Sequence, residues 1–324
     1  MAAEIARAVA LLRAGELVAF PTETVYGLGA DAANPQAVTK IFAAKERPAN
    51  HPLIVHLAAA ADIDDWAREI PDAAYKLATA FWPGPLTLIL KRSAKVPDAV
   101  TGGQDTVGLR VPDHPLALEL LSEFNGGIAA PSANRHGRIS PTTAAHVHRE
   151  LGETVSMVLD GGPCQVGIES TIVDLSRGAP AILRPGAITA ADISRVLGVA
   201  PGEGGKDKPR VSGSLASHYA PETRLRVLGR HSLLPAVQTA LAAGQRVAVI
   251  ARFSRPWDAT GLDWVAAPED AKGYAFELYA TLRMLDESGA DLILVEAPQS
   301  TEEWQAVADR LQRAARGSGA EDET

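Results

Sequence analysis

The stretch Pro21-Thr-Glu-Thr-Val-Tyr-Gly-Leu-Gly29 follows directly on the apolar run 17–20. A short apolar run bounded by turn-forming residues is typical of a buried strand, so this polar stretch is predicted to be the loop that leaves it. Two further polar segments, marked by proline, are Lys45-Glu-Arg-Pro-Ala-Asn-His-Pro-Leu53 and Pro131-Ser-Ala-Asn134. Each comes where a predicted strand or helix ends. We therefore expect the three segments to line one cleft.

The second polar segment follows a predicted helix. Asn34-Pro35 indicates where that helix starts, because Asn is a favoured N-cap and Pro is tolerated at the first helical position. The helix must stop before Pro48, since the residue preceding a proline avoids helical angles. Lys45 and Arg47 are thus expected at or just past the helix C-terminus. Beyond the end of the helix, two residues that are two positions apart, such as Lys45 and Arg47, need not point to opposite sides of the helix axis.

The first part of the chain mixes short strands with helices. Strands are expected at 53–57, 86–90, 107–111, 127–130, 157–159, 171–175 and 181–183, and helices at 61–70, 72–81, 114–124, 142–151 and 190–197. Few simple repeating units occur in this order. The pattern favours an α/β domain with a twisted mixed sheet over a regular doubly wound one.

A glycine- and lysine-rich segment separates this part from the rest. Pro201-Gly-Glu-Gly-Gly-Lys-Asp-Lys-Pro209 is flexible by composition, and we expect a linker over 198–221. Beyond it, strands at 225–228, 246–251 and 292–295 alternate with helices at 233–243, 274–287 and 302–315, which predicts a smaller, Rossmann-like βαβ parallel sheet. The predicted organisation is a first domain over 1–197, the linker, a second domain over 222–316 and a disordered tail over 317–324.

Composition fits a folded, two-domain protein. The chain has 324 residues, of which 46% are hydrophobic and 22% charged. No apolar run approaches the roughly 20 residues that cross a bilayer, so a cytoplasmic protein without a membrane anchor is expected. The single cysteine, Cys164, excludes an internal disulfide framework and fits a reducing compartment. A net charge of −8 argues against broad electrostatic binding to nucleic acid, so any cationic function must be local.

Two cations spaced Lys45-x-Arg47, facing a hydroxyl and an amide spaced Ser132-x-Asn134, are suited to hold a polyphosphate. Arg47 offers a fork for two phosphate oxygens, and Lys45 is a point charge that can follow charge developing in a transition state. The structural alternative is a pair of cations at a helix C-terminus and an ordinary Pro-Ser turn.

Three more polar residues lie within or at the end of apolar runs. Arg110 is costly to bury without an anionic partner, which could be a carboxylate or phosphate in the cleft or a salt bridge to Asp113 or Glu169. His56 is either a satisfied core histidine or part of the site. Arg184 lies at another strand end, where the neighbouring turn residues do not explain it.

Other catalytic constellations fail. There is no Gly-x-Ser-x-Gly elbow, and Ser132 with His136 lacks an obvious acidic third member, which argues against a serine hydrolase. His146-x-His148 places its rings on different helix sides, and neither His-Glu-x-x-His nor paired Cys-x-x-Cys occurs. Protein-ligated zinc is not expected. Magnesium could enter with the phosphates of a nucleotide, which needs few protein ligands.

As an ordered set, the motifs resemble the YrdC-like family, the threonylcarbamoyl-AMP synthases. The resemblance covers roughly residues 5–200 and rests on Pro21-Thr-x-Thr-x-Tyr-Gly-Leu28, Lys45-x-Arg-Pro48, Pro52-Leu53, Arg110-Val-Pro112, Pro131-Ser-Ala-Asn134, Ser170-Thr171 and Arg184-Pro-Gly186. The linker ending in Ser217-His-Tyr-Ala-Pro221 and the βαβ tail look like the two-domain members. Many of those read Pro-Gly-Met where this chain has Ser212-Gly-Ser214.

The resemblance implies a nucleotidyltransferase that condenses L-threonine, bicarbonate or CO2, and ATP. Its products would be threonylcarbamoyl-AMP and pyrophosphate. The intermediate would pass to downstream tRNA threonylcarbamoyl transfer proteins, for threonylcarbamoyladenosine in tRNA. Magnesium would be bound mainly through the ATP phosphates, with no metal ligand from the protein, and direct binding of tRNA would be weak or absent.

The resemblance also implies residue roles. The reactive centre and ATP phosphate contacts would be Lys45, Arg47, Ser132 and Asn134; further nucleotide contacts would be His51, Thr106, Ser140 and Arg184; threonine would be held by Thr24, His56, Arg110, Ser170 and the backbone of Ala130; and His218 with Tyr219 would form a lid. Asparagine is common in the family where this chain has His51.

Two other readings stay open. One is a carbamoyltransferase of the hydrogenase-maturation type, although the zinc-finger-like cysteines and the acylphosphatase-like region of those proteins are missing from this sequence. The other is a non-catalytic module that binds double-stranded RNA or tRNA. It requires a basic face and a salt-sensitive affinity for RNA, which the net charge disfavours.

Overall fold

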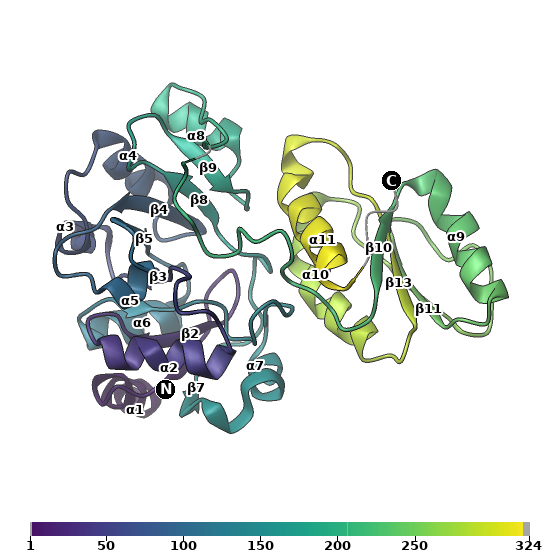
Figure 1. The fold of residues 1–324 in the computed structure, drawn as a ribbon, viewed down its shortest axis with the longest axis horizontal. Helices are drawn as coiled ribbons and strands as arrows, with labels where there is room; N and C mark the ends of the chain where they lie inside the picture. The colour runs from purple at the N-terminus through teal and green to yellow at the C-terminus, as the bar shows by residue number, and fades with distance from the viewer. Residues whose placement is uncertain (1, 206, 320–324) are drawn as a thin grey trace. The chain divides into compact units, whose positions relative to one another are not determined.

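The computed structural model describes residues 2–205 and 207–319, which fall into two compact units (Figure 1). The first unit contains the residues up to 136 together with 140–214; the second contains 137–139 and the residues from 215 on. The predicted linker straddles this division, because its residues up to Ser214 belong to the first unit. Of the predicted tail, Gly317 is the last residue of the final helix, and 320–324 lie outside the described residues.

The first unit is built on a nine-stranded mixed sheet with the order β7-β1-β2-β6-β3-β5-β4-β8-β9. Three of its neighbouring pairs are parallel and five are antiparallel, which confirms the predicted mixed α/β sheet. The strands are β1 (Val18–Phe20), β2 (Gly27–Asp31), β3 (Ile54–His56), β4 (Leu86–Lys91), β5 (Thr106–Arg110), β6 (Ile128–Ala129), β7 (Met157–Val158), β8 (Thr171–Asp174) and β9 (Ala181–Arg184).

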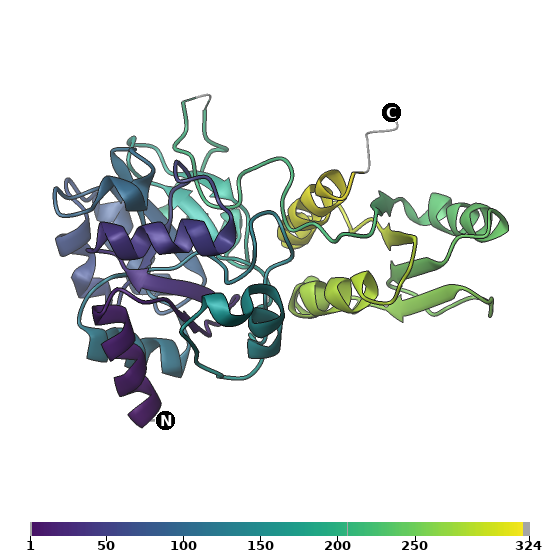
Figure 2. The same cartoon turned by 60° about the horizontal axis from the view of Figure 1, so that its bottom comes forward.

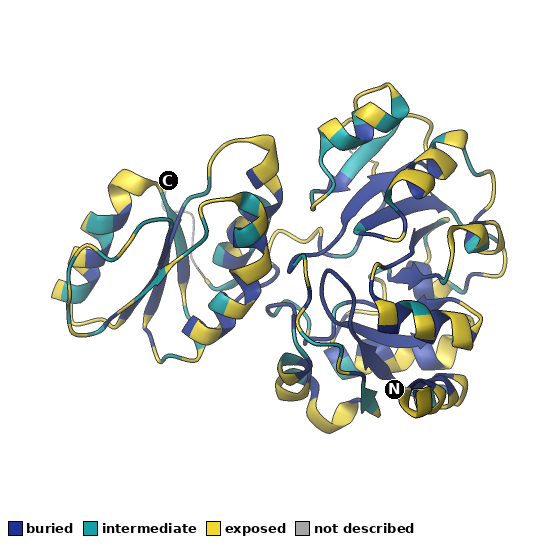
Figure 3. Ribbon diagram, turned by 180° about the vertical axis from the view of Figure 1, so that it is seen from behind, coloured by how far each residue is buried: buried dark blue, intermediate teal, exposed yellow. Residues whose placement is uncertain are grey.

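Helices cover this sheet and bury its apolar side chains in separate clusters, with the exposed helix faces outward (Figure 3). The larger cluster includes α2, α4, α7 and α8, and a second one joins α1 and α6 to β1. The helices are α1 (Ala2–Arg13), α2 (Pro35–Lys45), η1 (Ala60–Asp62), α3 (Ile63–Trp66), α4 (Asp72–Phe81), α5 (Asp98–Thr101), α6 (Pro115–Phe124), α7 (Ala144–Leu151), η2 (Gly152–Thr154) and α8 (Ala190–Leu197).

Successive side chains of the central strands β3 and β5 point alternately to the two faces of the sheet, which separates core residues from candidate site residues. Val55 of β3 and Leu109 of β5 point into the larger cluster. Successive side chains of a strand point to opposite faces, so His56 and Arg110 lie on the other face, where the sheet register pairs them directly. A polar face is thus produced by the same strands that build the core.

Two sequence predictions in this unit are wrong. The helix expected over 61–70 ends at Trp66, because the backbone of Ala67 and Arg68 instead pairs with that of Arg92 and Lys91 at the end of β4. The loop expected over 21–29 ends in strand β2, which lies between β1 and β6. Its glycines hide the strand signal, but Gly29 is required there: a Cβ would lie 2.9 Å from the Phe20 ring.

The second unit is a four-stranded sheet with the order β10-β13-β11-β12, in which every neighbouring pair is parallel. This confirms the predicted βαβ sheet, although strand β12 was not expected. Helix α9 lies on one face and α10 with α11 on the other (Figures 1 and 2). The elements are β10 (Leu225–Leu228), α9 (Arg230–Ala242), β11 (Val247–Ala251), β12 (Leu262–Ala266), α10 (Ala271–Asp286), β13 (Leu292–Glu296), η3 (Glu302–Trp304) and α11 (Gln305–Gly317).

Candidate active site

The end of α2 turns two cations inward. Glu46, the C-cap, has φ 53° and ψ 39°, so the chain reverses its direction by one left-handed residue. Lys45 before it and Arg47 after it are both buried, with exposed fractions of 1% and 7%, whereas Glu46 itself is exposed. A spacing of two on a continuing helix would have separated them. The left-handed cap instead brings both cations to the interior.

Lys45 reaches the Pro131–Asn134 segment. Its Nζ donates to the backbone oxygen of Ser132 at 2.5 Å and to that of Asn134. Burial and the nearby charge of Arg47 hold the pKa of Lys45 well below its ordinary value. The predicted Lys-x-Arg and Ser-x-Asn motifs therefore meet in space.

Arg47 contacts a segment far along the chain. Its Nη2 donates to the backbone oxygen of Pro52 at 3.0 Å and to Oγ of Ser212 at 3.2 Å. Arg184 contacts the same residue, since its Nη1 donates to the backbone oxygen of Ser212 at 3.0 Å. Ser212 thus joins two arginines that sequence analysis assigned to nucleotide binding. The atypical Ser212-Gly-Ser214 segment lies in the site of the first unit.

Two histidines lie beside these cations. The rings of His51 and His136 have centroids 5.3 Å apart, and the backbone nitrogen of His136 donates to the Lys45 oxygen at 2.8 Å. Burial, followed by the charge of Arg47, lowers the pKa of both, that of His136 to about 4. Both imidazoles are therefore neutral near pH 7, and His136 joins the predicted His51 in this part of the site.

Ser170 connects Arg184 to the central strands. Its Oγ accepts a hydrogen bond from Arg184 Nη2 at 3.0 Å and lies 2.7 Å from Thr87 Oγ1, while its backbone oxygen accepts from Arg184 Nε at 3.0 Å. Ser140, predicted to contact nucleotide, is buried and donates its hydroxyl to Glu169 at 2.5 Å. Both hydroxyls are therefore held by hydrogen bonds to other side chains of the protein.

Arg110 has a buried acidic partner that the sequence did not reveal. Its Nη2 lies 2.6 Å from Oε1 of Glu23, and both side chains are about 5% exposed or less. The partners considered from the sequence, Asp113 and Glu169, were wrong: Asp113 contributes only its backbone nitrogen, which donates to Glu23 Oε2 at 3.0 Å. Arg110 Nε also donates to the Gly84 oxygen at 3.3 Å, so its guanidinium is fixed in place.

The remaining residues predicted to bind threonine lie around Arg110 and the first polar segment. His56 is 3% exposed, and burial together with the charge of Arg110 lowers its pKa to about 3, so the ring is neutral. Thr24 is fully buried, with its hydroxyl 2.9 Å from that of Thr22. The backbone nitrogen of Ala130 donates to the Ile54 oxygen at 2.9 Å, which pins the third polar segment to β3.

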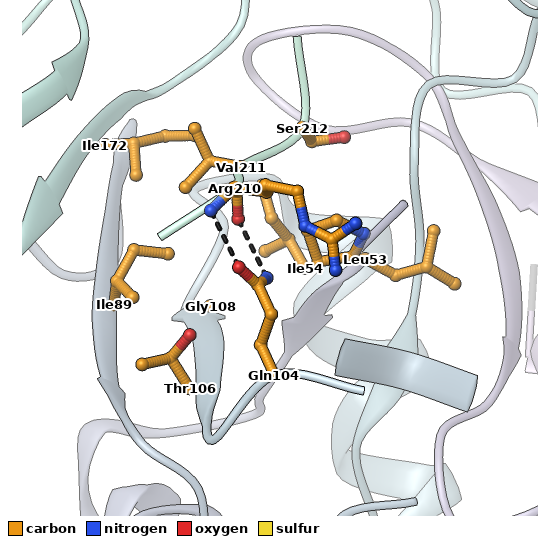
Figure 4. A pocket seen from close by; sticks show the side chains of 11 residues that line it. Leu53, Ile54, Ile89, Gln104, Thr106, Gly108, Ile172, Arg210, Val211 and Ser212 are labelled. Carbon is orange, nitrogen blue, oxygen red and sulfur yellow. Dashed lines mark hydrogen bonds between the residues drawn. The ribbon is translucent and has the colours of Figure 1, made fainter. Parts of the chain in front are cut away.

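A small pocket opens between the sheet and the 210–212 segment (Figure 4). The side-chain amide of Gln104 holds this segment with two hydrogen bonds to the backbone of Arg210, at 2.7 and 3.0 Å. Val211 packs into an apolar cluster with Ile54 and Ile89. Thr106, a predicted nucleotide contact, lines the pocket, whose internal space of about 10 Å³ is that of one water molecule.

The two predicted lid residues contact aromatic and cationic side chains of the second unit. The rings of His218 and Tyr219 have centroids 4.1 Å apart, Tyr219 lies 5.8 Å from the ring of Tyr279, and the guanidinium of Arg310 is 5.3 Å from the Tyr219 ring. Tyr219 has φ 62°, a left-handed conformation that few non-glycine residues adopt. Their role as a lid stays a prediction.

Two family models match the chain in sequence. The model Sua5_yciO_yrdC, described as telomere recombination, matches residues 10–186, and the model described as threonylcarbamoyl-AMP synthase, C-terminal domain, matches residues 188–316. The first alone spans more than half of the chain. The chain belongs to the threonylcarbamoyl-AMP synthase family. This confirms the family that the ordered motifs predicted.

Curated members of the threonylcarbamoyl-AMP synthase family align with nearly the whole chain. The synthase of Pyrococcus abyssi is 40% identical, with 95% of this chain and 92% of that protein covered, and the synthase of Bacillus subtilis is 41% identical, with 97% and 93% covered. The crystal structure of P. abyssi Sua5 complexed with L-threonine matches with a TM-score of 0.90 at 39% identity, covering 97% of this chain and 94% of that one. These alignments thus extend over both units of the chain.

Sequence reasoning missed three contributors to the site: Glu23, Ser212 and His136. Glu23 lies between Thr22 and Thr24 in the opening motif, a position that marks it as a candidate site residue but does not identify it as the partner of Arg110. Nothing in the sequence placed Ser212 beside Arg47, since the linker composition indicated only flexibility. The binding roles of the predicted site residues stay predictions, although their clustering is observed.

Proposed function

We propose that this chain catalyses the reaction of its family: L-threonine, bicarbonate or CO2, and ATP are condensed to threonylcarbamoyl-AMP and pyrophosphate. One observation carries the proposal. Lys45, Arg47, Arg110 and Arg184 are all buried in one unit, although the chain is acidic overall. Burying cations is costly unless anions accompany them, and this reaction supplies several anionic groups to a single site.

The nucleotide half would be formed by Lys45, Arg47 and Arg184. In the structure these side chains donate to neutral oxygens of Ser132, Pro52, Ser170 and Ser212. Negatively charged phosphate oxygens of ATP would replace some of these acceptors. His51, Thr106, Ser132, Asn134 and Ser140 are assigned to the same half.

The threonine half would be formed around Arg110. Its guanidinium would bind the carboxylate of threonine, and Glu23 would hold that guanidinium in register. Ser170 donates or accepts through its hydroxyl beside Arg184, so it lies where the two halves meet. The neutral ring of His56 avoids adding a second positive charge. Thr24 and the backbone of Ala130 complete this half.

The chemistry then depends on positioning. Bicarbonate and the neutral amine of threonine would condense to a carbamate with release of water. An oxygen of this carbamate would then attack the α-phosphorus of ATP. A new oxygen–phosphorus bond forms, the bond between the α-phosphorus and its bridging oxygen breaks, and pyrophosphate leaves. Lys45 and Arg47 would offset the charge that gathers on the phosphates. Holding the two reactants together supplies most of the remaining acceleration.

Magnesium would enter on the ATP phosphates. Among residues 2–205 and 207–319, no group of three or more His, Cys, Asp or Glu side chains could hold a metal ion. The donors of the nucleotide half are mainly N–H groups and cations, which suit phosphate oxygens. Bound there, Mg²⁺ would neutralise part of the triphosphate charge.

Nucleotide entry would require the 210–212 segment to move. The pocket beneath it holds about one water molecule, which is too little for a nucleobase. Ser212 also occupies one donor each of Arg47 and Arg184. Closure of this segment, with His218 and Tyr219 as further lid residues, would shield the intermediate from water.

Among residues 2–205 and 207–319, no helix is long and apolar enough to span a membrane.

Pyrophosphate release tests the function. Purified protein with ATP should release pyrophosphate only when both L-threonine and bicarbonate are present, and mass spectrometry should detect threonylcarbamoyl-AMP. A carbamoyltransferase would instead require carbamoyl phosphate, and a non-catalytic RNA-binding module would release no pyrophosphate. Pyrophosphate release at the same rate with and without L-threonine would exclude the proposed reaction.

A further inference from the structure

The second unit carries a charged cluster at the carboxyl edge of its parallel sheet, which we call the edge cluster: Arg230, Arg252, Glu296 and Tyr274. Arg230 begins α9 after β10, Arg252 follows β11 directly, and Glu296 is the last residue of β13. Three separate strands therefore deliver charge to one edge. Sequence analysis assigned none of these residues a role.

The cluster lies at the point where the chain changes direction. Strands β13 and β11 are neighbours, and Glu296 and Arg252 stand at their carboxyl ends. After β13 the chain leads to α11, which packs on β10, whereas after β11 it leads to β12 on the other side. Open α/β sheets bind ligands in the crevice outside the carboxyl ends of strands that diverge in this way.

Glu296 organises the two arginines. It is 1% exposed; its Oε2 accepts from the Arg252 backbone nitrogen at 2.7 Å, and its Oε1 lies 3.2 Å from Arg252 Nη2 and 3.4 Å from Arg230 Nη1. The Arg252 guanidinium lies 5.0 Å from the ring of Trp304. One carboxylate therefore holds two guanidiniums, and the cluster keeps a net positive charge.

Two donors of the cluster lack acceptors. Arg252 Nε and the hydroxyl of Tyr274 are buried and make no hydrogen bond in the part of the chain that the structure describes. Tyr274 is only 2% exposed, and its ring lies 5.4 Å from that of Trp304, beside Arg252. Leaving a buried donor without an acceptor is costly, and such groups in native proteins call for a partner.

The outer side of the cluster suits a phosphate group. The side chain of Arg230 is 62% exposed and lies over the Phe253 ring at 4.7 Å, so its donors are presented to solvent. The helix that it begins has Gly229 as N-cap, without a capping side chain, and a Cβ at Gly229 would meet open space. The first turn of a helix attracts phosphate through its N–H groups and its dipole.

We propose that the edge cluster binds a small molecule through a phosphate group. Arg230 and the first turn of α9 make the outer contacts. Arg252 and Tyr274 supply the inner donors, with Glu296 fixing both arginines. All residues of this site belong to the second unit, whereas those of the nucleotide half belong to the first.

Amide hydrogen exchange on the full-length protein tests the proposal, because it resolves the two units by sequence. AMP and inorganic phosphate are added in separate arms, with acetate and chloride arms at equal ionic strength. Saturable protection of peptides spanning 229–234, 251–256 and 295–304 in the AMP or phosphate arm supports the site. Protection by AMP alone assigns a nucleotide, and protection by both assigns the phosphate group. No protection there, or the same protection in the acetate and chloride arms, identifies an adventitious ion only and overturns it.

Two variants sharpen the test. Arg230→Ala should raise the ligand concentration that gives half-maximal protection about tenfold, which is the loss of affinity expected for a charge-assisted contact. Arg224→Ala is the matched control, since Arg224 is also an exposed arginine but precedes β10 at the opposite edge. Equal effects of the two variants would refute the site. Tyr274→Phe removes only the hydroxyl. It should raise the melting temperature of the free protein, because a buried donor without an acceptor is lost, and it should reduce the rise in melting temperature on addition of AMP. A rise in melting temperature with AMP as large as that of the wild type would also count against the proposal.

Discussion

Removal of the Arg47 guanidinium should disable the nucleotide half and spare the threonine half. In the proposed complex, Arg47 exchanges its contacts with Pro52 and Ser212 for phosphate oxygens. A hydrogen bond to a charged group contributes about 1.5–3 kcal/mol, so Arg47→Ala should cost about 3 kcal/mol in transition-state stabilisation. That loss is roughly a hundredfold decrease in kcat/KM for ATP. Arg47→Glu adds charge repulsion and should abolish pyrophosphate release.

The assay compares three proteins. Pyrophosphate release is measured at varied ATP with threonine and bicarbonate saturating, for the wild type, Arg47→Ala and the control Arg7→Ala, whose arginine is exposed on α1. Circular dichroism verifies that each variant is folded. Calorimetry then measures threonine binding without nucleotide, which Arg47→Ala should leave within about twofold of the wild type because Arg47 belongs to the other half.

Two results would refute this reasoning. A folded Arg47→Ala protein with unchanged kcat/KM for ATP would show that Arg47 does not bind phosphate. A loss of threonine affinity as large as the loss for ATP would show that the two halves are not divided as proposed.

Three further predictions concern positioning, acid stability and backbone geometry. Glu23→Gln should raise KM for threonine about tenfold through the loosened Arg110 guanidinium, with KM for ATP unchanged in the same assay, and an equal rise in both would contradict its positioning role. The pKa of His56 is lowered to about 3, so the unfolded chain takes up a proton below its ordinary pKa of about 6.5 while the native protein does not. The free energy of unfolding should therefore decrease as pH falls. Between pH 6.5 and 5, urea unfolding should show a decrease that is about 2 kcal/mol larger for the wild type than for His56→Gln. Equal decreases in the two proteins would show that His56 is not the cause. Gly186→Ala would place a Cβ 2.3 Å from the Thr171 nitrogen, so it should lower both the melting temperature and pyrophosphate release, and a variant with wild-type values would show that the turn adapts.

Local rules predicted much of the fold. The N-cap Asn34 and the helix stop before Pro48 gave the limits of α2 to within a few residues, because capping depends on neighbours in sequence. The same rules placed Lys45 and Arg47 at its end. They could not supply the left-handed Glu46 that turns both cations inward, since glutamate rarely adopts that conformation.

Long-range contacts explain what the sequence did not reveal. The helix expected over 61–70 ended early because Lys91, the last residue of β4, and Arg92 after it offer backbone partners. Strand β12 has only one fully buried residue and lies at a sheet edge, so its apolar pattern is weak. The ion pair of Glu23 with Arg110 joins two motifs that are distant in the chain, and a single sequence contains no signal for that pairing.

Calorimetry of threonine binding tests the central claim, a divided site that gathers threonine and ATP. L-Threonine is titrated into the wild type, Arg110→Ala and Arg47→Ala, with L-serine as comparator, and each titration is repeated with a non-hydrolysable ATP analogue. The account predicts that threonine binds the wild type more tightly than serine does, that Arg110→Ala abolishes threonine binding, and that Arg47→Ala retains it while losing the effect of the analogue. Undiminished threonine binding by Arg110→Ala would contradict the account.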